Sequence, residues 1–265
     1  MGKTGTTSIQ ETAFHALDAS APVGYFPKTA LHIGSHVELV PKHGSYDENA
    51  LAAGFEKIRS DTRDFLISCE LIGSDVQIIE AIQQKARKYF NGRLRAIITL
   101  RPPSEWYRSN FRQKVKTGRY LIGESFGGFV ERVNYPGFKL VRTWQQHLGD
   151  DVRVLQYQRD NFLSKFFSVL GLRSQHFAAL DRTANISLNE HQTQYLRMMD
   201  EKAGEAGRTA QNYRGSFNLE SLITKNLDAH RLPPLEAGPQ HALKCLDMEY
   251  ERRLEEWRRC KLLLE

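Results

Sequence analysis

The first eight residues, MGKTGTTS, combine residue types that suit a loop wrapped around an anion. Gly2 and Gly5 allow tight turns, so successive backbone N–H groups can point at one centre. Lys3 adds a compact positive charge. Hydroxyl donors follow it at Thr4, Thr6, Thr7 and Ser8. A Walker A loop would need a further glycine six residues before its lysine, a position outside this sequence. The alternative interpretation is that these residues bind no anion and form a polar, unstructured end of the chain.

A helical pattern directly behind this loop favours the anion-binding interpretation. Ile9, Ala13, Ala16 and Leu17 recur at spacings of one to four residues that place them on one helix face. The N-terminus of such a helix presents unpaired N–H groups and the positive end of its dipole. We therefore expect the loop and the helix to hold one anionic group together.

A second cluster of polar residues follows an apolar run, in IITLRPPSEWYRSNFRQKVKTG. A strand is expected to end at Leu100, which places Arg101 at the carboxyl edge where open α/β sheets bind ligands. Pro102–Pro103 force an extended exit, and Ser104 suits an N-cap. Ser109 follows in the helix, where its hydroxyl and the Arg101 fork would together suit a terminal phosphate. Alternatively, Arg101 only ends the strand and Ser109 is a surface hydroxyl.

The elements that must position these residues alternate between short apolar runs and helical patterns, which is typical of an α/β fold with a parallel sheet. Strands are predicted at Phe65–Ser68, Leu94–Leu100 and Val152–Tyr157. Helices are predicted around Val76–Tyr89, Trp106–Val115, Phe126–Val133 and Phe138–Leu148, and a final charged helix carries an apolar face from Leu243 to Leu264. Residues 20–50 and about 204–239 are predicted to be long loops.

Composition and charge exclude several classes of protein. The 265 residues are 40% hydrophobic and 26% charged, as in an ordinary globular protein, and one domain is expected. No run has the ~18–20 apolar residues of a membrane helix, and no signal peptide opens the sequence. Three dispersed cysteines favour a reducing compartment, so we expect a cytoplasmic protein. The net charge of +6 favours an anionic ligand; basic residues are not interleaved with aromatic ones, which argues against nucleic acid.

The two polar clusters together resemble the sulfotransferase superfamily, in particular its carbohydrate-type and bacterial members. The resemblance extends through TGTTSIQ, LISCE, RSNFRQKVKTG, PGFKLVRTWQQHLGDDVRVLQY and NISLNEHQTQYLR. It covers most of residues 1–200, so 201–265 would be a C-terminal loop and helix extension of a single sulfotransferase-like domain. The resemblance implies an α/β, three-layer, P-loop NTPase-like fold with a central parallel sheet flanked by helices. It also implies 3′-phosphoadenosine 5′-phosphosulfate (PAPS) as co-substrate.

Carried over to this sequence, the resemblance gives each cluster a role in sulfuryl transfer. The 5′-phosphosulfate loop would comprise Lys3, Thr4, Gly5, Thr6, Thr7 and Ser8. Arg101 and Ser109 would bind the 3′-phosphate. Lys3 would stabilise the leaving bridge oxygen, and the sulfuryl group carries too little charge to imply a metal. The acceptor would be a hydroxyl, expected on a sugar or glycoconjugate; the oligomeric state is left open.

The acceptor hydroxyl also needs a general base. Glu70, just past the strand FLIS, occupies the position of a glutamate in similar family members. His36 is the runner-up because a histidine pKa lies naturally near neutrality. His32 and His43 are further candidates. Each of these side chains also has a non-catalytic interpretation: Glu70 as an exposed carboxylate at a strand end, and each histidine as an ordinary structural residue.

The resemblance departs from the family at its start. Similar members have a buried strand before the loop, whereas here Met1 falls where an internal methionine would be. The expectation is a gene model truncated at its 5′ end, with the first strand missing.

The basic run Arg108, Arg112, Lys114, Lys116 and Arg119 would line a cleft for an acidic acceptor or form a solvated helix face.

Two other functions are compatible with the same residues. One is a P-loop kinase that uses ATP and magnesium, with LISCE as a Walker-B-like strand end. The other is a non-catalytic relative that binds anionic polysaccharide. Activity that survives EDTA favours sulfuryl transfer over the kinase. Affinity for adenosine 3′,5′-bisphosphate favours the sulfotransferase over the polysaccharide-binding relative.

Overall fold

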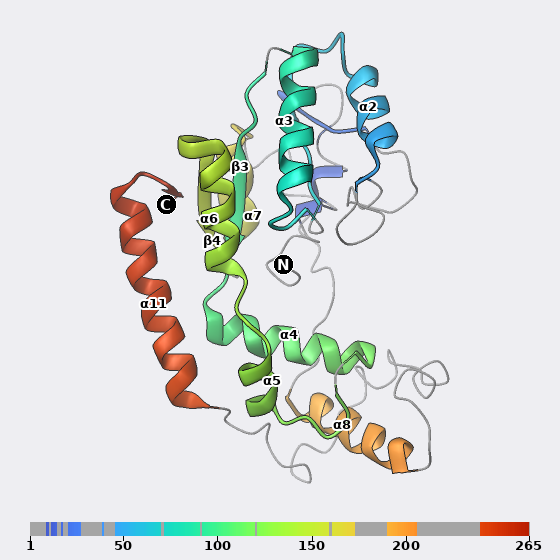
Figure 1. Ribbon diagram of the computed structural model, residues 1–265, viewed down its shortest axis with the longest axis vertical. Coiled ribbons are helices and arrows are strands. Elements are labelled where there is room, and N and C mark those ends of the chain that lie inside the picture. Colours follow the sequence, from blue (N-terminus) through green and yellow to red (C-terminus); the bar gives the residue numbers. More distant parts are fainter. Residues whose placement is uncertain are drawn as a thin grey trace. The chain divides into compact units, whose positions relative to one another are not determined.

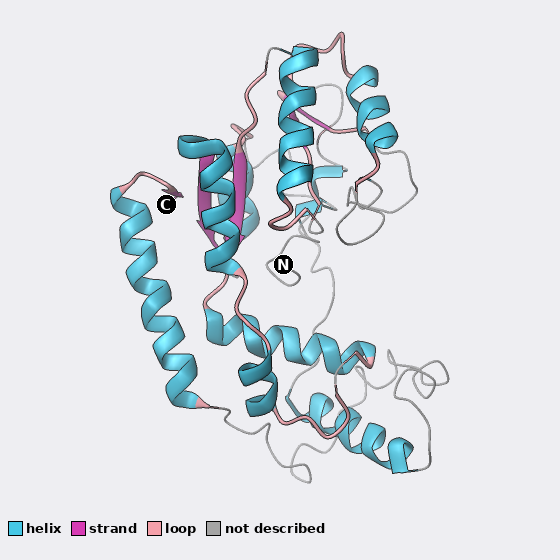
Figure 2. Ribbon diagram, in the orientation of Figure 1, coloured by secondary structure: helices cyan, strands magenta, loops and turns pink. Residues whose placement is uncertain are grey.

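The computed structural model shows an α/β chain whose strands pair in parallel (Figures 1 and 2). It divides into two compact units. Unit 1 comprises Met1–Arg101, Pro136–Ala184 and Arg253–Glu265, and unit 2 comprises Pro102–Tyr135 and Asn185–Arg252. The structure describes residues 9–10, 12–14, 17, 21–27, 39, 46–69, 72–90, 92–119, 121–158, 161–172, 190–205 and 239–264.

Unit 1 contains two parallel sheets. In the first, β1 (Val23–Tyr25) pairs with β2 (Asp64–Leu66). In the second, β4 (Val152–Gln156) lies between β3 (Ala96–Leu100) and β5 (Leu263–Leu264). The predicted strands are therefore confirmed, although the first begins and ends earlier than FLIS. The predicted loop at 20–50 was wrong for β1, because three residues are too few to show an alternating pattern.

The faces of β3 and β4 are covered by helices, which explains why four of the five residues of β3 and three of the five residues of β4 are apolar. Figure 1 shows α6 (Gly137–Leu148) on one face of these strands and α7 (Phe162–Val169) on the other. A short 3₁₀ turn (η2), Gly149–Asp151, joins α6 to β4. The predicted helix from Phe138 to Leu148 is confirmed.

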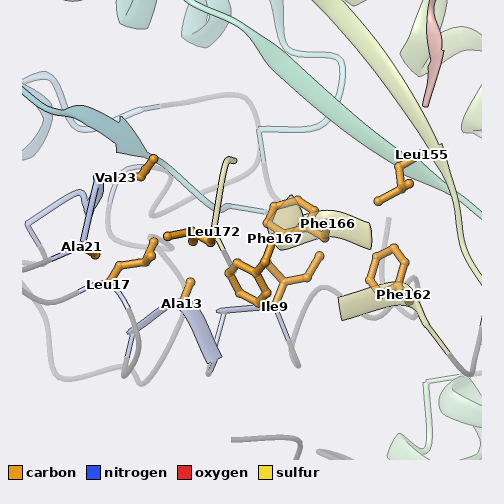
Figure 3. Packing of buried hydrophobic residues seen from close by; sticks show 10 residues of the cluster. All are labelled: Ile9, Ala13, Leu17, Ala21, Val23, Leu155, Phe162, Phe166, Phe167 and Leu172. Atoms are coloured by element: carbon orange, nitrogen blue, oxygen red, sulfur yellow. The ribbon is translucent and has the colours of Figure 1, made fainter. Parts of the chain in front are cut away.

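One apolar cluster attaches the N-terminal helix to α7. Ile9, Ala13 and Leu17 are buried in one cluster with Phe166 and Phe167 (Figure 3). Residues 9–10 and 12–14 are helical, and the Leu17 N–H donates to the Ala13 carbonyl at 2.9 Å. The helix predicted directly behind the N-terminal loop is thus confirmed in its described residues.

A second apolar cluster in unit 1 packs against β2 through Phe65. It is formed mainly by α2 (Glu48–Lys57) and α3 (Val76–Phe90), with Phe55 and Ile79 buried at its centre. Trp144 of α6 packs against the same cluster and donates from Nε1 to the Gly73 carbonyl at 2.7 Å. The predicted helix from Val76 to Tyr89 is confirmed; α2 lies partly in the stretch that was expected to be a loop.

Unit 2 is helical in its described residues. It contains α4 (Pro103–Thr117), α5 (Phe126–Arg132), α8 (Glu190–Glu205) and most of α11 (Gln240–Arg259). Aromatic side chains form its core: the Phe111 ring lies 5.5 Å from Phe126 and 5.2 Å from Phe129. The helices predicted around 106–115 and 126–133 are confirmed.

Two boundary predictions were wrong. Ser104 is not the N-cap of α4: Pro102 is, Pro103 opens the helix, and the Ser104 N–H donates to the Asp247 carboxylate at 2.9 Å. The fixed backbone of proline suits the first helical position, so the cap comes from a distant side chain instead. Leu264 does not continue the last helix but pairs in β5, because α11 ends at Arg259.

Among the described helices, none combines the length and the apolar character needed to cross a bilayer.

Candidate functional site

The described part of the candidate site lies at the carboxyl ends of β3 and β4. The two strands pair in register, with Leu100 opposite Gln156, so Arg101 and Tyr157 are the next residues on neighbouring strands. The Tyr157 N–H donates to the Leu100 carbonyl at 2.6 Å, which extends the pairing to the last position before Arg101. The strand-end position predicted for Arg101 is therefore correct.

Arg101 stacks on the Tyr157 ring. The guanidinium carbon lies 4.0 Å from the ring centroid, close enough for a cation–π interaction. Stacking uses the face of the guanidinium, whereas its N–H donors lie in the plane and point outward from its edge. The contact therefore orients the guanidinium through its face, and its N–H donors play no part in this contact.

Tyr157 is itself held in place by the core of unit 1. Its ring lies 4.9 Å from that of Phe162, the first residue of α7. The same helix supplies Phe166 and Phe167, against which Ile9 and Ala13 pack. The support of Arg101 and the start of the described N-terminal helix thus belong to one apolar cluster of unit 1.

Most of the predicted site residues lie outside the described part of the chain. These are the loop residues Lys3, Thr4, Gly5, Thr6, Thr7 and Ser8, the base candidate Glu70, and the histidines His32, His36 and His43. Glu70 directly follows Cys69, the last described residue after β2. The roles assigned to these residues remain predictions.

Ser109 lies on α4 in unit 2 and is partly buried, whereas Arg101 ends the first segment of unit 1. The joint binding of one phosphate by Arg101 and Ser109 therefore remains a prediction.

The basic run on α4 has a structural use inside unit 2. The Glu190 carboxylate of α8 lies 2.9 Å from the Arg112 guanidinium and 3.7 Å from that of Arg108. Arg108 also lies over the Phe126 ring, with its guanidinium carbon 5.6 Å from the centroid. Two of the five cations thus connect α4 to its neighbours. Gly118, with a φ of 67°, then ends α4 in the left-handed conformation that glycine adopts without strain.

Tyr157 is the site residue that sequence reasoning missed. The signal was present, because VRVLQY was predicted as a strand that ends at this tyrosine. What the sequence did not provide was the register between β3 and β4, which brings the two strand ends together.

Comparisons with known proteins yield no relative: no family model matches this chain, and no curated protein or solved structure is significantly similar to it.

Proposed function

We propose that this chain transfers a sulfuryl group from PAPS to a hydroxyl acceptor, on a three-layer P-loop-like fold. The observation that carries the proposal is the Arg101 fork, held on Tyr157 at the carboxyl edge of a parallel sheet. Its support belongs to the same cluster as the helix behind the glycine-, lysine- and hydroxyl-rich loop. Two anion receptors connected to one rigid core suit a ligand with two separate anionic groups, as PAPS has.

The proposed roles divide between the two ends of the donor. Arg101, with Ser109, binds the 3′-phosphate and sets the position of the nucleotide. The loop from Lys3 to Ser8 surrounds the 5′-phosphosulfate with backbone and hydroxyl donors. Binding at both ends places the sulfur in line with the acceptor oxygen, so that the reaction is not limited by random encounter.

In the transfer step, the acceptor oxygen forms a bond to sulfur as the bond from sulfur to the bridging phosphate oxygen breaks. Adenosine 3′,5′-bisphosphate leaves with the electron pair of the broken bond. Lys3 stabilises the charge that develops on the bridging oxygen. The acceptor proton passes to a base, for which Glu70 is the first candidate and His36 the second. A sugar or glycoconjugate hydroxyl is the proposed acceptor.

The decisive test is a transfer assay with radiolabelled PAPS and a panel of sugar and glycan acceptors, run with and without EDTA. Transfer of label that survives EDTA supports the proposal. Label transfer from γ-labelled ATP that requires magnesium would replace it with a kinase. Calorimetry with adenosine 3′,5′-bisphosphate provides a second readout. Absence of both transfer and nucleotide affinity, with affinity for an anionic polysaccharide, would support a binding protein instead.

A further inference from the structure

Helix α11 carries a histidine and a cysteine together on one exposed face. His241 and Cys245 are four residues apart, so their side chains lie on the same side of successive turns. Both residues are exposed, and the Cys245 Sγ lies 3.7 Å from the His241 Nε2. A cysteine sulfur and a histidine nitrogen are the two commonest protein ligands of zinc, and here they already lie close together.

This exposed face is opposite to the face of α11 that packs in the core. With 3.6 residues per turn, Tyr250 points about 180° away from His241 around the helix axis. Tyr250, Leu254 and Trp257 are buried. The histidine and the cysteine therefore take no part in the packing of α11, and an ion from solvent can reach them.

The separation of the two atoms fits a single tetrahedral ion. Zn–S bonds are ~2.3 Å long and Zn–N bonds ~2.0–2.1 Å, so a tetrahedral angle places the sulfur and the nitrogen ~3.5–3.6 Å apart. The distance in α11 is 3.7 Å, longer by only ~0.1–0.2 Å, which is the tolerance on metal–ligand distances. Zinc could therefore bind both atoms without a change in the backbone of the helix.

The remaining ligands of such an ion would come from solvent. Within the described part of the chain, no third histidine, cysteine, aspartate or glutamate joins this pair in a group that could hold a metal. Zinc in proteins usually has four ligands, which leaves two positions for water. The ion would therefore be held less tightly than in a structural zinc site with four protein ligands.

We propose that His241 and Cys245 form a zinc-binding site on the exposed face of α11. On binding, the Cys245 thiol loses its proton to solvent and the thiolate sulfur bonds to Zn²⁺, as does the lone pair of the His241 Nε2. The ion joins two successive turns, so it stabilises the helix near the end at which α11 begins. This site does not depend on which reaction the chain catalyses.

The first test is calorimetric titration of Zn²⁺ into the reduced full chain and into three variants, His241→Ala, Cys245→Ser and Cys260→Ser. Cys260 is the matched control, because it is also exposed but has Glu256 instead of a histidine four residues before it. The parent and Cys260→Ser should each bind one ion per chain with equal affinity. His241→Ala and Cys245→Ser should bind at least about tenfold more weakly, because even the loss of a group that supports a ligand costs that much.

Alkylation by N-ethylmaleimide, followed by peptide mass spectrometry, compares the two exposed cysteines within the parent chain and needs no variant. Saturating Zn²⁺ should slow the modification of Cys245 by about tenfold or more, because a metal-bound thiolate is not free to react. The modification of Cys260 should proceed at the same rate with and without Zn²⁺. In His241→Ala, the protection of Cys245 should be lost.

Three outcomes would overturn the proposal. Equal zinc affinity in the parent and in His241→Ala would mean that the thiol binds alone. Equal protection of Cys245 and Cys260 from alkylation would mean that zinc binds to any exposed thiol of the chain. One ion per two chains, together with a zinc-dependent dimer in size-exclusion chromatography, would assign the ion to a site between two copies. Circular dichroism of each variant checks that a lost affinity is not a lost fold.

Discussion

Arg101 and Tyr157 each directly follow the last residue of one of two neighbouring parallel strands, and the guanidinium carbon of Arg101 lies over the Tyr157 ring, 4.0 Å from its centroid. A strand end is a rigid place for a ligand-binding side chain, because its backbone is held by the sheet. Stacking then orients the side chain itself. The position and the orientation of the Arg101 guanidinium are therefore both set by the fold, so the binding that we propose for it would cost less ordering.

Removing the Arg101 fork should weaken donor binding. We expect Arg101→Ala to cost ~1.5–3 kcal/mol in PAPS affinity, the range for a hydrogen bond to a charged group. The affinity for adenosine 5′-phosphosulfate, which lacks the 3′-phosphate, should change little. Isothermal titration with both donors measures the difference. Equal losses for the two donors would show that Arg101 supports the structure instead of binding the phosphate.

The Tyr157 ring should contribute through orientation of Arg101. Tyr157→Leu removes the ring face and should cost ~0.5–2 kcal/mol in PAPS affinity, the range of a cation–π contact. Tyr157→Phe keeps the ring and serves as the matched control, with affinity close to that of the parent. The same titrations apply, and a loss in the phenylalanine variant as large as in the leucine variant would assign the effect to the hydroxyl.

The proposed catalytic residues differ in what their removal should change. Lys3→Ala should lower kcat far more than it lowers PAPS affinity, because its charge matters most as the bridging oxygen becomes negative.

Glu70→Gln should lower kcat by ~10²–10⁴ and leave affinity for adenosine 3′,5′-bisphosphate nearly unchanged. Single-turnover rates and titrations measure both. Near-normal turnover in Glu70→Gln, with turnover abolished in His36→Ala, would assign the base to His36. A histidine base would also place the acidic limb of the pH–rate profile near ~6.5.

The cap of α4 by Asp247 offers a test of stability within unit 2. Its carboxylate accepts from the Ser104 N–H at 2.9 Å, at the end of the helix where the dipole is positive. Asp247→Ala should lower the free energy of unfolding by ~0.5–2 kcal/mol, as for other lost caps. Asp247→Asn keeps an acceptor oxygen and should lose less. Urea unfolding measures both variants, and an alanine variant as stable as the parent would contradict the role of the cap.

Tyr250 should make stability depend on alkaline pH. Burial, reinforced by the charges of Glu251, Glu105 and Asp247, raises the pKa of its hydroxyl in the folded state. Above the ordinary tyrosine pKa of ~10, the unfolded chain loses this proton while the folded chain keeps it. The folded state then binds more protons, so the free energy of unfolding falls as pH rises. Below the ordinary tyrosine pKa both states keep the proton, so the contribution of Tyr250 to the free energy of unfolding is fully present.

Tyr250→Phe should make this alkaline loss less steep. The hydroxyl is buried and has no hydrogen-bond partner among the described residues. Its removal at pH 7 should therefore leave the free energy of unfolding unchanged or raise it by ~1 kcal/mol. Urea unfolding between pH 7 and pH 11 measures the slope, and an unchanged slope would mean that other groups account for it. Burial raises the pKa of Tyr135 too, so part of the decline should persist.

The sequence by itself determined the long elements and the residues at their ends. Helices α3, α4 and α6 were predicted because each is long enough for its apolar residues to show a period, and strands β3 and β4 because each contains a short apolar run. Arg101 was placed correctly at the end of β3 for the same reason. The short strands β1 and β5 were missed, since two or three residues carry no period and form strands only because a neighbour pairs with them.

Only the tertiary structure decided which separate elements meet. Strand register paired Arg101 with Tyr157, and packing on α7 connected Ile9 to the same cluster. Asp247, which is distant in sequence, accepts the hydrogen bond that caps α4. Arg108 and Arg112 pair with Glu190 on another helix. Such long-range contacts depend on how whole faces pack, and a local pattern specifies only the face that each element presents.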